Sequence, residues 1–299
     1  MLNKNKKLIL LIIFLFFILS GCSTKKDIVK NNKIKIAATI FPLFDIVQIV
    51  GGEKIDPILI LSPGASPHTY SATPKKIKEI QGTKIIFGIG LGVDNWVTNI
   101  ANTVSGVEII NLDKNISLKY FKDQDNSREN IVDPHYWLSP ANAETIAKQI
   151  ALELSKIDRV NQEYYQSQVE QFISKLKIKD IEWKSKISKL ENKNLIMFHD
   201  AWGYFADYFG LNIVATFEPF PGKTPSPKYL VNLQKEIKKY NIKTIFVEPQ
   251  LSKEAIQTMA DDLGVSIKTL DPLGGFDKRN SYLDLIDFNI KSMTIKKIN

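Results

Sequence analysis

The stretch from Asp158 to Leu190 reads DRVNQEYYQSQVEQFISKLKIKDIEWKSKISKL. It contains no glycine and no proline, and apolar residues recur among many Gln, Glu and Lys residues. This pattern predicts one long helix, with a candidate break between Lys179 and Trp183. A helix of about 30 residues is about 45 Å long, which exceeds the length of one small domain. The stretch therefore predicts a helix that links two lobes.

Short apolar runs alternate with amphipathic segments on both sides of this helix. The expected strands are residues 34–40, 58–61, 84–87 and 108–110 before it, and residues 194–198, 213–216, 244–247 and 265–270 after it. Thr73, Ser139 and Ser226 each precede a proline, which marks a helix start with a side-chain cap. No internal repeat is evident. The alternation predicts an α/β fold, in which two lobes with mostly parallel sheets covered by helices are joined by one long rigid helix.

The N-terminus has the layout of an export signal. Three lysines lie among the first seven residues, and twelve apolar residues follow without a break, from Leu8 to Leu19. Twelve residues are too few to cross a bilayer core of about 30 Å at about 1.5 Å per residue. Leu19-Ser20-Gly21-Cys22 resembles the bacterial lipobox, which implies cleavage before Cys22 and acylation of that cysteine. The expected organisation is a signal peptide over residues 1–21, a tether over 22–33, an N-terminal lobe over 34–157, the linking helix over 158–190 and a C-terminal lobe over 191–299.

Charge and cysteine content exclude several classes of protein. The formal net charge is +8, and loss of the three signal-peptide lysines leaves 37 basic and 32 acidic residues, a balance of +5. The remaining lysines are scattered and no arginine-rich stripe is present, so a nucleic-acid site is not expected. Cys22 is the only cysteine, which excludes a disulfide framework and a thiolate metal site.

The chain has only three histidines, His68, His135 and His199. His199 and Asp271 each follow an expected strand directly, and ligands of open α/β sheets bind beyond the carboxyl ends of the strands. The intervals from His68 through His135 and His199 to Asp271 are 67, 64 and 72 residues, so no short zinc-finger or HExxH spacing is present. Any metal site must be assembled from distant loops. By residue type alone, scattered histidines are more often structural or surface residues.

Six segments resemble, in order, the signatures of the solute-binding lipoproteins of bacterial zinc and manganese ABC importers. They are PGASPHTY (63–70), DPHYWLSP (133–140), FHDAWGYF (198–205), PSP (225–227), VEPQ (247–250) and LDPLG (270–274). The resemblance extends from about Ile34 to at least Gly275. It implies two α/β lobes bridged by a long rigid helix, with a metal ion clamped between them. It also implies four metal ligands, which are His68 and His135 from the N-terminal lobe and His199 and Asp271 from the C-terminal lobe.

The third ligand position favours zinc. Manganese-type relatives tend to carry a carboxylate there, whereas this chain has His199. Three imidazoles and one carboxylate suit zinc, and manganese prefers a more oxygen-rich shell. Many zinc-specific relatives also carry a long His- and acid-rich loop before the second ligand, but residues 115–132 contain no histidine. Glu248 or water are the alternatives to Asp271. Asp133 is expected either to orient His135 or to cap a turn.

The expected function is that of an extracytoplasmic carrier, not an enzyme, which captures Zn²⁺ and delivers it to an ABC permease. The resemblance and the lipobox together imply a protein anchored by lipid to the cell membrane, and we expect a monomer that binds no nucleic acid. The alternatives are a manganese carrier of the same family, a zinc-dependent adhesin and a zinc hydrolase. A hydrolase would keep one zinc position open for water, with a general base beside it.

Overall fold

Two four-stranded parallel sheets form the framework of the computed structural model, which describes residues 33–121, 131–218, 226–251 and 254–295. The expected signal peptide, Cys22 and nearly all of the expected tether lie outside these residues. The first sheet contains β1 (Ile34–Ala38), β2 (Ile55–Leu59), β3 (Ile85–Gly88) and β4 (Glu108–Asn111) in the order β2-β1-β3-β4. The second contains β7 (Asn194–His199), β8 (Asn212–Glu218), β9 (Thr244–Val247) and β10 (Ser266–Thr269) in the order β10-β9-β7-β8.

The two sheets have the same connectivity, although the sequence shows no repeat. In each, the first strand lies between the second and the third, and the fourth lies at the far edge. The strand order therefore reverses between β1 and β3 and between β7 and β9. In open α/β sheets, ligands bind at such points, beyond the carboxyl ends of the strands. The expectation of two α/β lobes with parallel sheets is confirmed.

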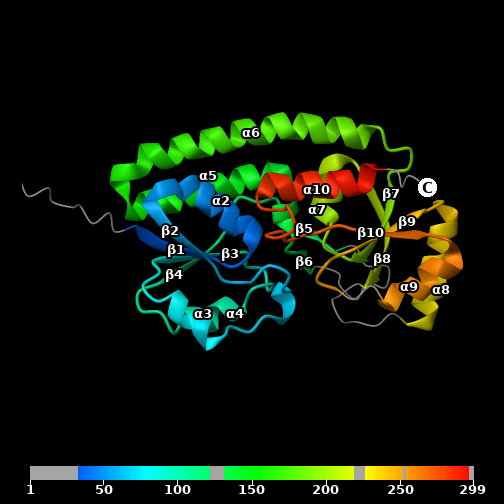
Figure 1. Cartoon of the computed structure of the whole chain (residues 1–299), viewed down its shortest axis with the longest axis horizontal. Helices are drawn as coiled ribbons and strands as arrows, with labels where there is room; N and C mark the ends of the chain where they lie inside the picture. The colour runs from blue at the N-terminus through cyan, green and yellow to red at the C-terminus, as the bar shows by residue number, and fades with distance from the viewer. Residues whose placement is uncertain (1–32, 122–130, 219–225, 252–253, 296–299) are drawn as a thin grey trace, which may run out of the picture. The chain divides into compact units, whose positions relative to one another are not determined.

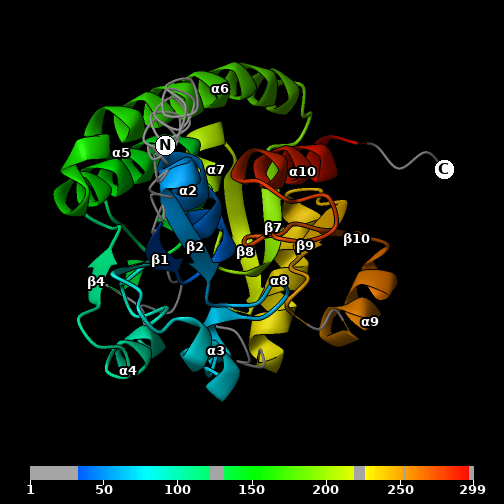
Figure 2. The ribbon, with the colours of Figure 1, turned by 60° about the vertical axis from the view of Figure 1, so that its left-hand side comes forward.

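Helices cover both faces of each sheet (Figure 2). Successive residues of a strand point to opposite faces, so Ile36 packs with α2 (Phe41–Gly51) and α5 (Pro140–Ile157), and Ala37 packs toward α3 (Pro74–Glu79) and α4 (Trp96–Ala101). In the second sheet, Met197 packs on the side of α7 (Gly203–Phe209) and α10 (Tyr282–Thr294). Its neighbour Ile196 packs toward α8 (Pro227–Lys239) and α9 (Glu254–Leu263).

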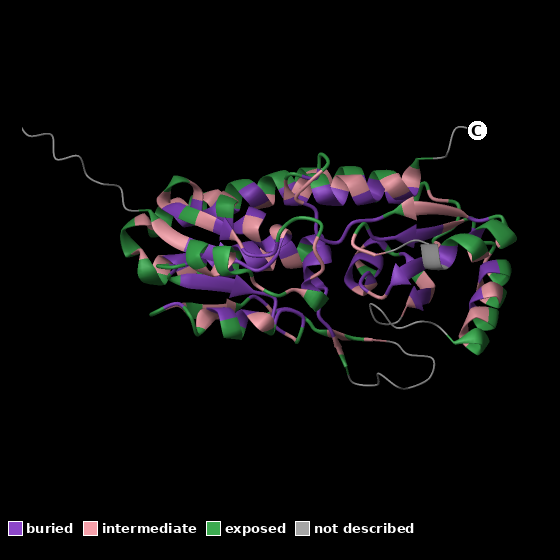
Figure 3. Ribbon diagram, turned by 60° about the horizontal axis from the view of Figure 1, so that its bottom comes forward, coloured by how far each residue is buried: buried purple, intermediate pink, exposed green. Residues whose placement is uncertain are grey.

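The long helix α6 (Gln162–Ser188) runs past both sheets (Figure 1). Its buried residues are Tyr165, Val169, Phe172, Leu176, Trp183 and Ile187, which recur at helical spacing along one face. This face packs against α2 and α5 of the first lobe and α10 of the second. A single apolar cluster extends from β1 to α10, so the two lobes share a core (Figure 3).

Several local expectations were wrong in detail. The helix α6 is continuous through residues 179–183, and a 3-10 turn, η4 (Arg159–Asn161), replaces its expected first turn. Thr73 and Ser226 cap their helices as expected, but the side chain of Ser139 makes no capping bond to α5. The sequence patterns did not indicate α2, α10 or the short antiparallel pair of β5 (Lys119–Tyr120) and β6 (Val132–Asp133). Within the described residues, no helix is both long and apolar enough to span a membrane.

Candidate metal centre

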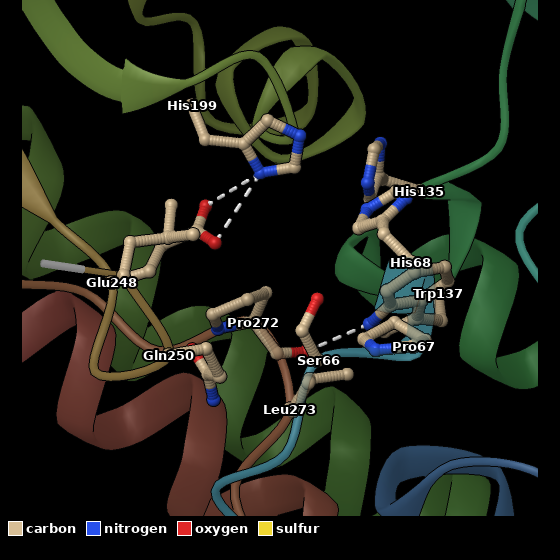
Figure 4. Close-up of a pocket in the computed structure, with 11 residues that line it drawn as sticks. Ser66, Pro67, His68, His135, Trp137, His199, Glu248, Gln250, Pro272 and Leu273 are labelled. Carbon is tan, nitrogen blue, oxygen red and sulfur yellow. Dashed lines mark hydrogen bonds and ion pairs between the residues drawn. The ribbon is translucent and has the colours of Figure 1, made fainter. Parts of the chain in front are cut away.

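The three histidines meet between the two lobes (Figure 4). One ring nitrogen of each lies within 4.8 Å of a ring nitrogen of the others. The ring centroids are 5.8 Å apart for His68 and His135, 5.4 Å for His68 and His199, and 5.2 Å for His135 and His199. Two imidazole nitrogens on one tetrahedral zinc ion lie about 3.3 Å apart, given Zn–N bonds of about 2.0–2.1 Å. Small movements of the rings are therefore sufficient to close the cluster on an ion.

His68 is the most exposed of the three histidines and lies on a 3-10 turn, η2 (Pro67–Thr69), in the loop after β2. The indole of Trp96 donates to the carbonyl oxygen of Pro67 over 2.9 Å and packs edge-on against Tyr70, which ties this loop to α4. Although the residue is partly open to solvent, its ring lines a small cavity between the lobes. Burial of the ring is the main cause that lowers the pKa of His68 to about 4, and the nearby His135 and His199 act in the same direction. His68 is consequently neutral at physiological pH, which is the form that binds a metal.

His135 is held by a buried carboxylate of its own lobe. It follows β6 and precedes a second 3-10 turn, η3 (Tyr136–Leu138). The Asp133 Oδ1 atom accepts hydrogen bonds from the His135 backbone N–H over 2.9 Å and from its Nδ1 over 2.8 Å. Both residues are buried. Both contacts expected of Asp133 are present in this structure, since its Oδ1 atom caps the turn at the His135 backbone N–H and also contacts the His135 ring.

His199 is held in the same way by a carboxylate of the second lobe. It ends β7, and Glu248 follows the neighbouring strand β9. The two carboxylate oxygens of Glu248 lie 3.2 and 3.3 Å from the His199 Nδ1, and Trp202 donates its indole N–H to one of them over 3.1 Å. Burial lowers the pKa of His199, but the charge and hydrogen bond of Glu248 outweigh burial and raise it above the ordinary value. Burial likewise raises the pKa of Glu248, and His199 outweighs that effect and lowers it.

Asp271 is not part of the histidine cluster in this structure. It follows β10, and its Oδ1 atom accepts hydrogen bonds from the backbone N–H groups of Leu273 and Gly274 and from the Gln250 amide. Its Oδ2 atom lies 2.8 Å from Nε of the buried Arg279, as an ion pair without hydrogen-bond geometry. Asp271 as a ligand therefore stays a prediction. The sequence patterns did not single out Arg279, which lies eight residues beyond Asp271.

A small cavity lies beside the rings. Its volume is about 20 Å³, close to the room that one water molecule or one bare metal ion needs. Its lining residues come from both lobes and are Ser66, Pro67, His68, His135, Trp137, His199, Glu248, Gln250, Leu251, Pro272 and Leu273. The Trp137 indole donates to the carbonyl oxygen of Pro272 over 2.8 Å, which joins the lobes at the floor of the cavity. Asp123, Asp125 and Glu129, which are the acids within residues 115–132, lie outside the described residues.

A pair of α/β lobes, each with helices on both faces of a parallel sheet and with a histidine cluster between them, defines a candidate metal-ion site. The family described as "Zinc-uptake complex component A periplasmic" matches residues 36–295, and the chain belongs to that family. The chain is 27% identical to the high-affinity zinc uptake system protein ZnuA of Bacillus subtilis, over 88% of both chains. It is also 27% identical to the zinc-binding protein AdcA of Streptococcus pyogenes, over 92% of this chain but only 57% of that protein.

Two solved structures have the same fold as this chain. A zinc-bound variant of AdcAII of Streptococcus pneumoniae is 27% identical and superposes with a TM-score of 0.74, covering 87% of this chain and 98% of that one. A crystal structure of ZnuA, 24% identical, superposes with a TM-score of 0.77 over 88% of this chain and 98% of that one, which supports the fold.

Proposed function

We propose that this chain is an extracytoplasmic solute-binding protein that captures one Zn²⁺ ion and delivers it to an ABC permease. The observation that carries the proposal is the convergence of His68, His135 and His199, whose ring nitrogens lie within 4.8 Å of one another although they come from three distant loops. Three imidazoles form a nitrogen-rich set that suits zinc. Relatives named for zinc uptake or zinc binding support this choice of metal.

The proposed zinc shell contains the three histidines and, as the fourth ligand, Asp271. Asp271 enters the shell only if its ion pair with Arg279 opens. Two observations support such an exchange. The ion pair of Asp271 and Arg279 lacks hydrogen-bond geometry. Pro272 and Leu273, which follow Asp271 directly, line the cavity. The zinc ion would then replace the guanidinium as the counter-charge of a buried carboxylate.

The site is proposed to carry the ion without catalysing a reaction on it. Catalytic zinc keeps a position for water next to a general base. The buried carboxylates beside the histidines are Asp133 and Glu248, and both already accept hydrogen bonds from ligand imidazoles. Both are therefore already engaged in holding the rings.

Residues 1–33 are proposed to place the carrier at the membrane. The layout of residues 1–21 and the lipobox at Cys22 support an export signal and a lipid anchor, followed by a tether. A relative of Lactococcus lactis named "Metal ABC transporter substrate-binding lipoprotein" supports the same assignment. We further propose that the mature chain is a monomer, with lobes over residues 34–157 and 191–299 joined by residues 158–190.

Native mass spectrometry of the full-length chain, released from detergent after equilibration with equimolar zinc and manganese, tests the proposed cargo. We expect one zinc ion per chain and no retained manganese. A chain that keeps one manganese ion in this competition would be a manganese carrier of the same family. A chain that keeps neither metal would overturn the proposal.

A further inference from the structure

We infer that Glu248 and Asp133 are positioning residues, each of which holds one buried imidazole by its Nδ1 atom so that its Nε2 atom faces the ion. The inference rests on the proposed zinc site and assigns roles to two side chains that do not themselves bind the metal. The pattern occurs once in each lobe. Asp133 orients His135 in the first lobe. Glu248 orients His199 in the second lobe, where both of its carboxylate oxygens face the His199 ring (Figure 4).

The environment of each carboxylate indicates this role. Glu248 is 6% exposed and Asp133 is 3% exposed, and a buried carboxylate is costly unless it is paired. Asp133 accepts two hydrogen bonds, both from His135. Glu248 accepts from His199 and from the Trp202 indole. Because these donors hold the Asp133 Oδ1 atom and the Glu248 carboxylate in place, both carboxylates support the rings.

The chemical effect follows from the two nitrogens of imidazole. A carboxylate at Nδ1 selects the tautomer with the proton on that atom, leaves the Nε2 lone pair free and makes the ring a better electron donor. A metal that binds at Nε2 leaves the bond between Nδ1 and the carboxylate in place. His135 and His199 therefore reach the ion without a search over tautomers or ring orientations.

The close packing around Asp133 supports the same assignment. A Cβ atom at Gly203, the first residue of α7, would lie 2.8 Å from the Asp133 Oδ2 atom. A side chain at this position would collide with the carboxylate, so the start of α7 can lie this close to Asp133 only because residue 203 is glycine. His199 lies just before α7 in the chain. Asp133 is consequently packed between the ring that it orients and the second lobe.

His68 differs from the other two histidines. Among the described residues, no hydrogen-bond partner is found for its ring. The residue lies on the short turn η2 and is the most exposed of the three histidines. Two rings are therefore set in advance, and the third completes the site.

The test compares Glu248→Ala, Glu248→Gln and Asp133→Asn with the wild-type full-length chain in detergent. Zinc affinity is measured by competition with a chromophoric chelator, and the ligand set is measured from the visible absorption of the Co²⁺-loaded protein. We expect Glu248→Ala to weaken zinc binding by about 10–100-fold, as is typical when a ligand histidine loses its supporting carboxylate. Glu248→Gln and Asp133→Asn, which keep an acceptor oxygen, should lose less. The Co²⁺ spectrum should keep the wild-type coordination number in all three.

Asp94→Asn is the matched control. Asp94 is a buried carboxylate of the first lobe that accepts hydrogen bonds from Thr39 and from the backbone of Ile89 and Gly90, and it contacts no histidine. It should leave zinc affinity unchanged. Unchanged affinity in Glu248→Ala would overturn the inference, and so would a Co²⁺ spectrum showing a lost ligand in Glu248→Gln, since Glu248 would then bind the metal. A wild-type chain that binds no zinc would instead overturn the proposed function.

Discussion

Glu248 and Asp271 are two buried carboxylates at the same edge of the same sheet, and they have different partners. Each follows one of two neighbouring parallel strands, β9 and β10. Glu248 is paired with His199, whereas Asp271 is paired with Arg279. Position at the end of a strand brings an acid to the site, but the side chain that it meets there decides its role.

The largest loss of zinc-induced stabilisation is expected when Glu248 loses its partner, His199. Replacing His199 by alanine removes a ligand and leaves Glu248 without its cation, so most of the zinc-induced stabilisation should disappear. For the wild-type chain at a zinc concentration 1,000-fold above Kd, that stabilisation is about 4 kcal/mol, or roughly 10 °C in Tm. Thermal unfolding with and without zinc measures it. Lys177→Ala, on the exposed face of α6, should keep the full shift, and a full shift in His199→Ala would remove His199 from the site.

The second-largest effect is a loss of stability when Asp271 loses its partner, Arg279. Arg279→Ala leaves a buried carboxylate unpaired, so the metal-free protein should lose about 3 kcal/mol of stability in a denaturant titration. The zinc-induced rise in Tm should then exceed that of the wild-type chain, because the ion supplies the missing positive charge to Asp271.

Arg279→Lys keeps the positive charge and is the control for this experiment. It should lose less stability, although lysine cannot reproduce the packing of the guanidinium between Phe276 and Phe288. If the zinc-induced shift in Arg279→Ala were no larger than in the wild-type chain, Asp271 would not belong to the zinc shell.

The smallest effect concerns a third buried carboxylate, Asp45 on α2, which accepts the Tyr282 backbone N–H at the start of α10. Burial raises its pKa to about 6 from 3.8, despite that hydrogen bond. The folded chain therefore holds this proton more tightly than the unfolded chain does, so the contribution of Asp45 to stability is fully present below pH 4 and is lost as the pH rises through 6. Asp45→Asn should remove this pH dependence and stabilise the protein at pH 7 by on the order of 2 kcal/mol. Denaturant titrations at pH 4.5 and pH 7 measure both effects, and an unchanged pH dependence would contradict the assignment.

Much of the fold was predictable from local patterns. The β-branched runs located the eight strands of the two sheets to within a few residues, and the stretch without glycine or proline located α6. The break predicted near Lys179 to Trp183 is not present, because Trp183 and Ile187 continue the buried face of α6 against the second lobe. Tertiary packing decided this point, which local composition cannot report.

The site was less accessible to sequence reasoning. Ordered segments around His68, His135 and His199 predicted that these residues would meet, and the structure brings them together. The partners of the carboxylates could not be read in the same way. Arg279 lies in no recognisable segment, and whether Glu248 faces a histidine or an ion depends on how β7 and β9 are placed side by side.

X-ray absorption at the zinc edge of the zinc-loaded full-length chain reports the ligands of the bound ion. We expect three imidazole nitrogens at about 2.0–2.1 Å and oxygen donors in the remaining positions, without sulfur. A spectrum that requires two imidazoles or fewer would contradict the assignment of His68, His135 and His199 as the zinc ligands.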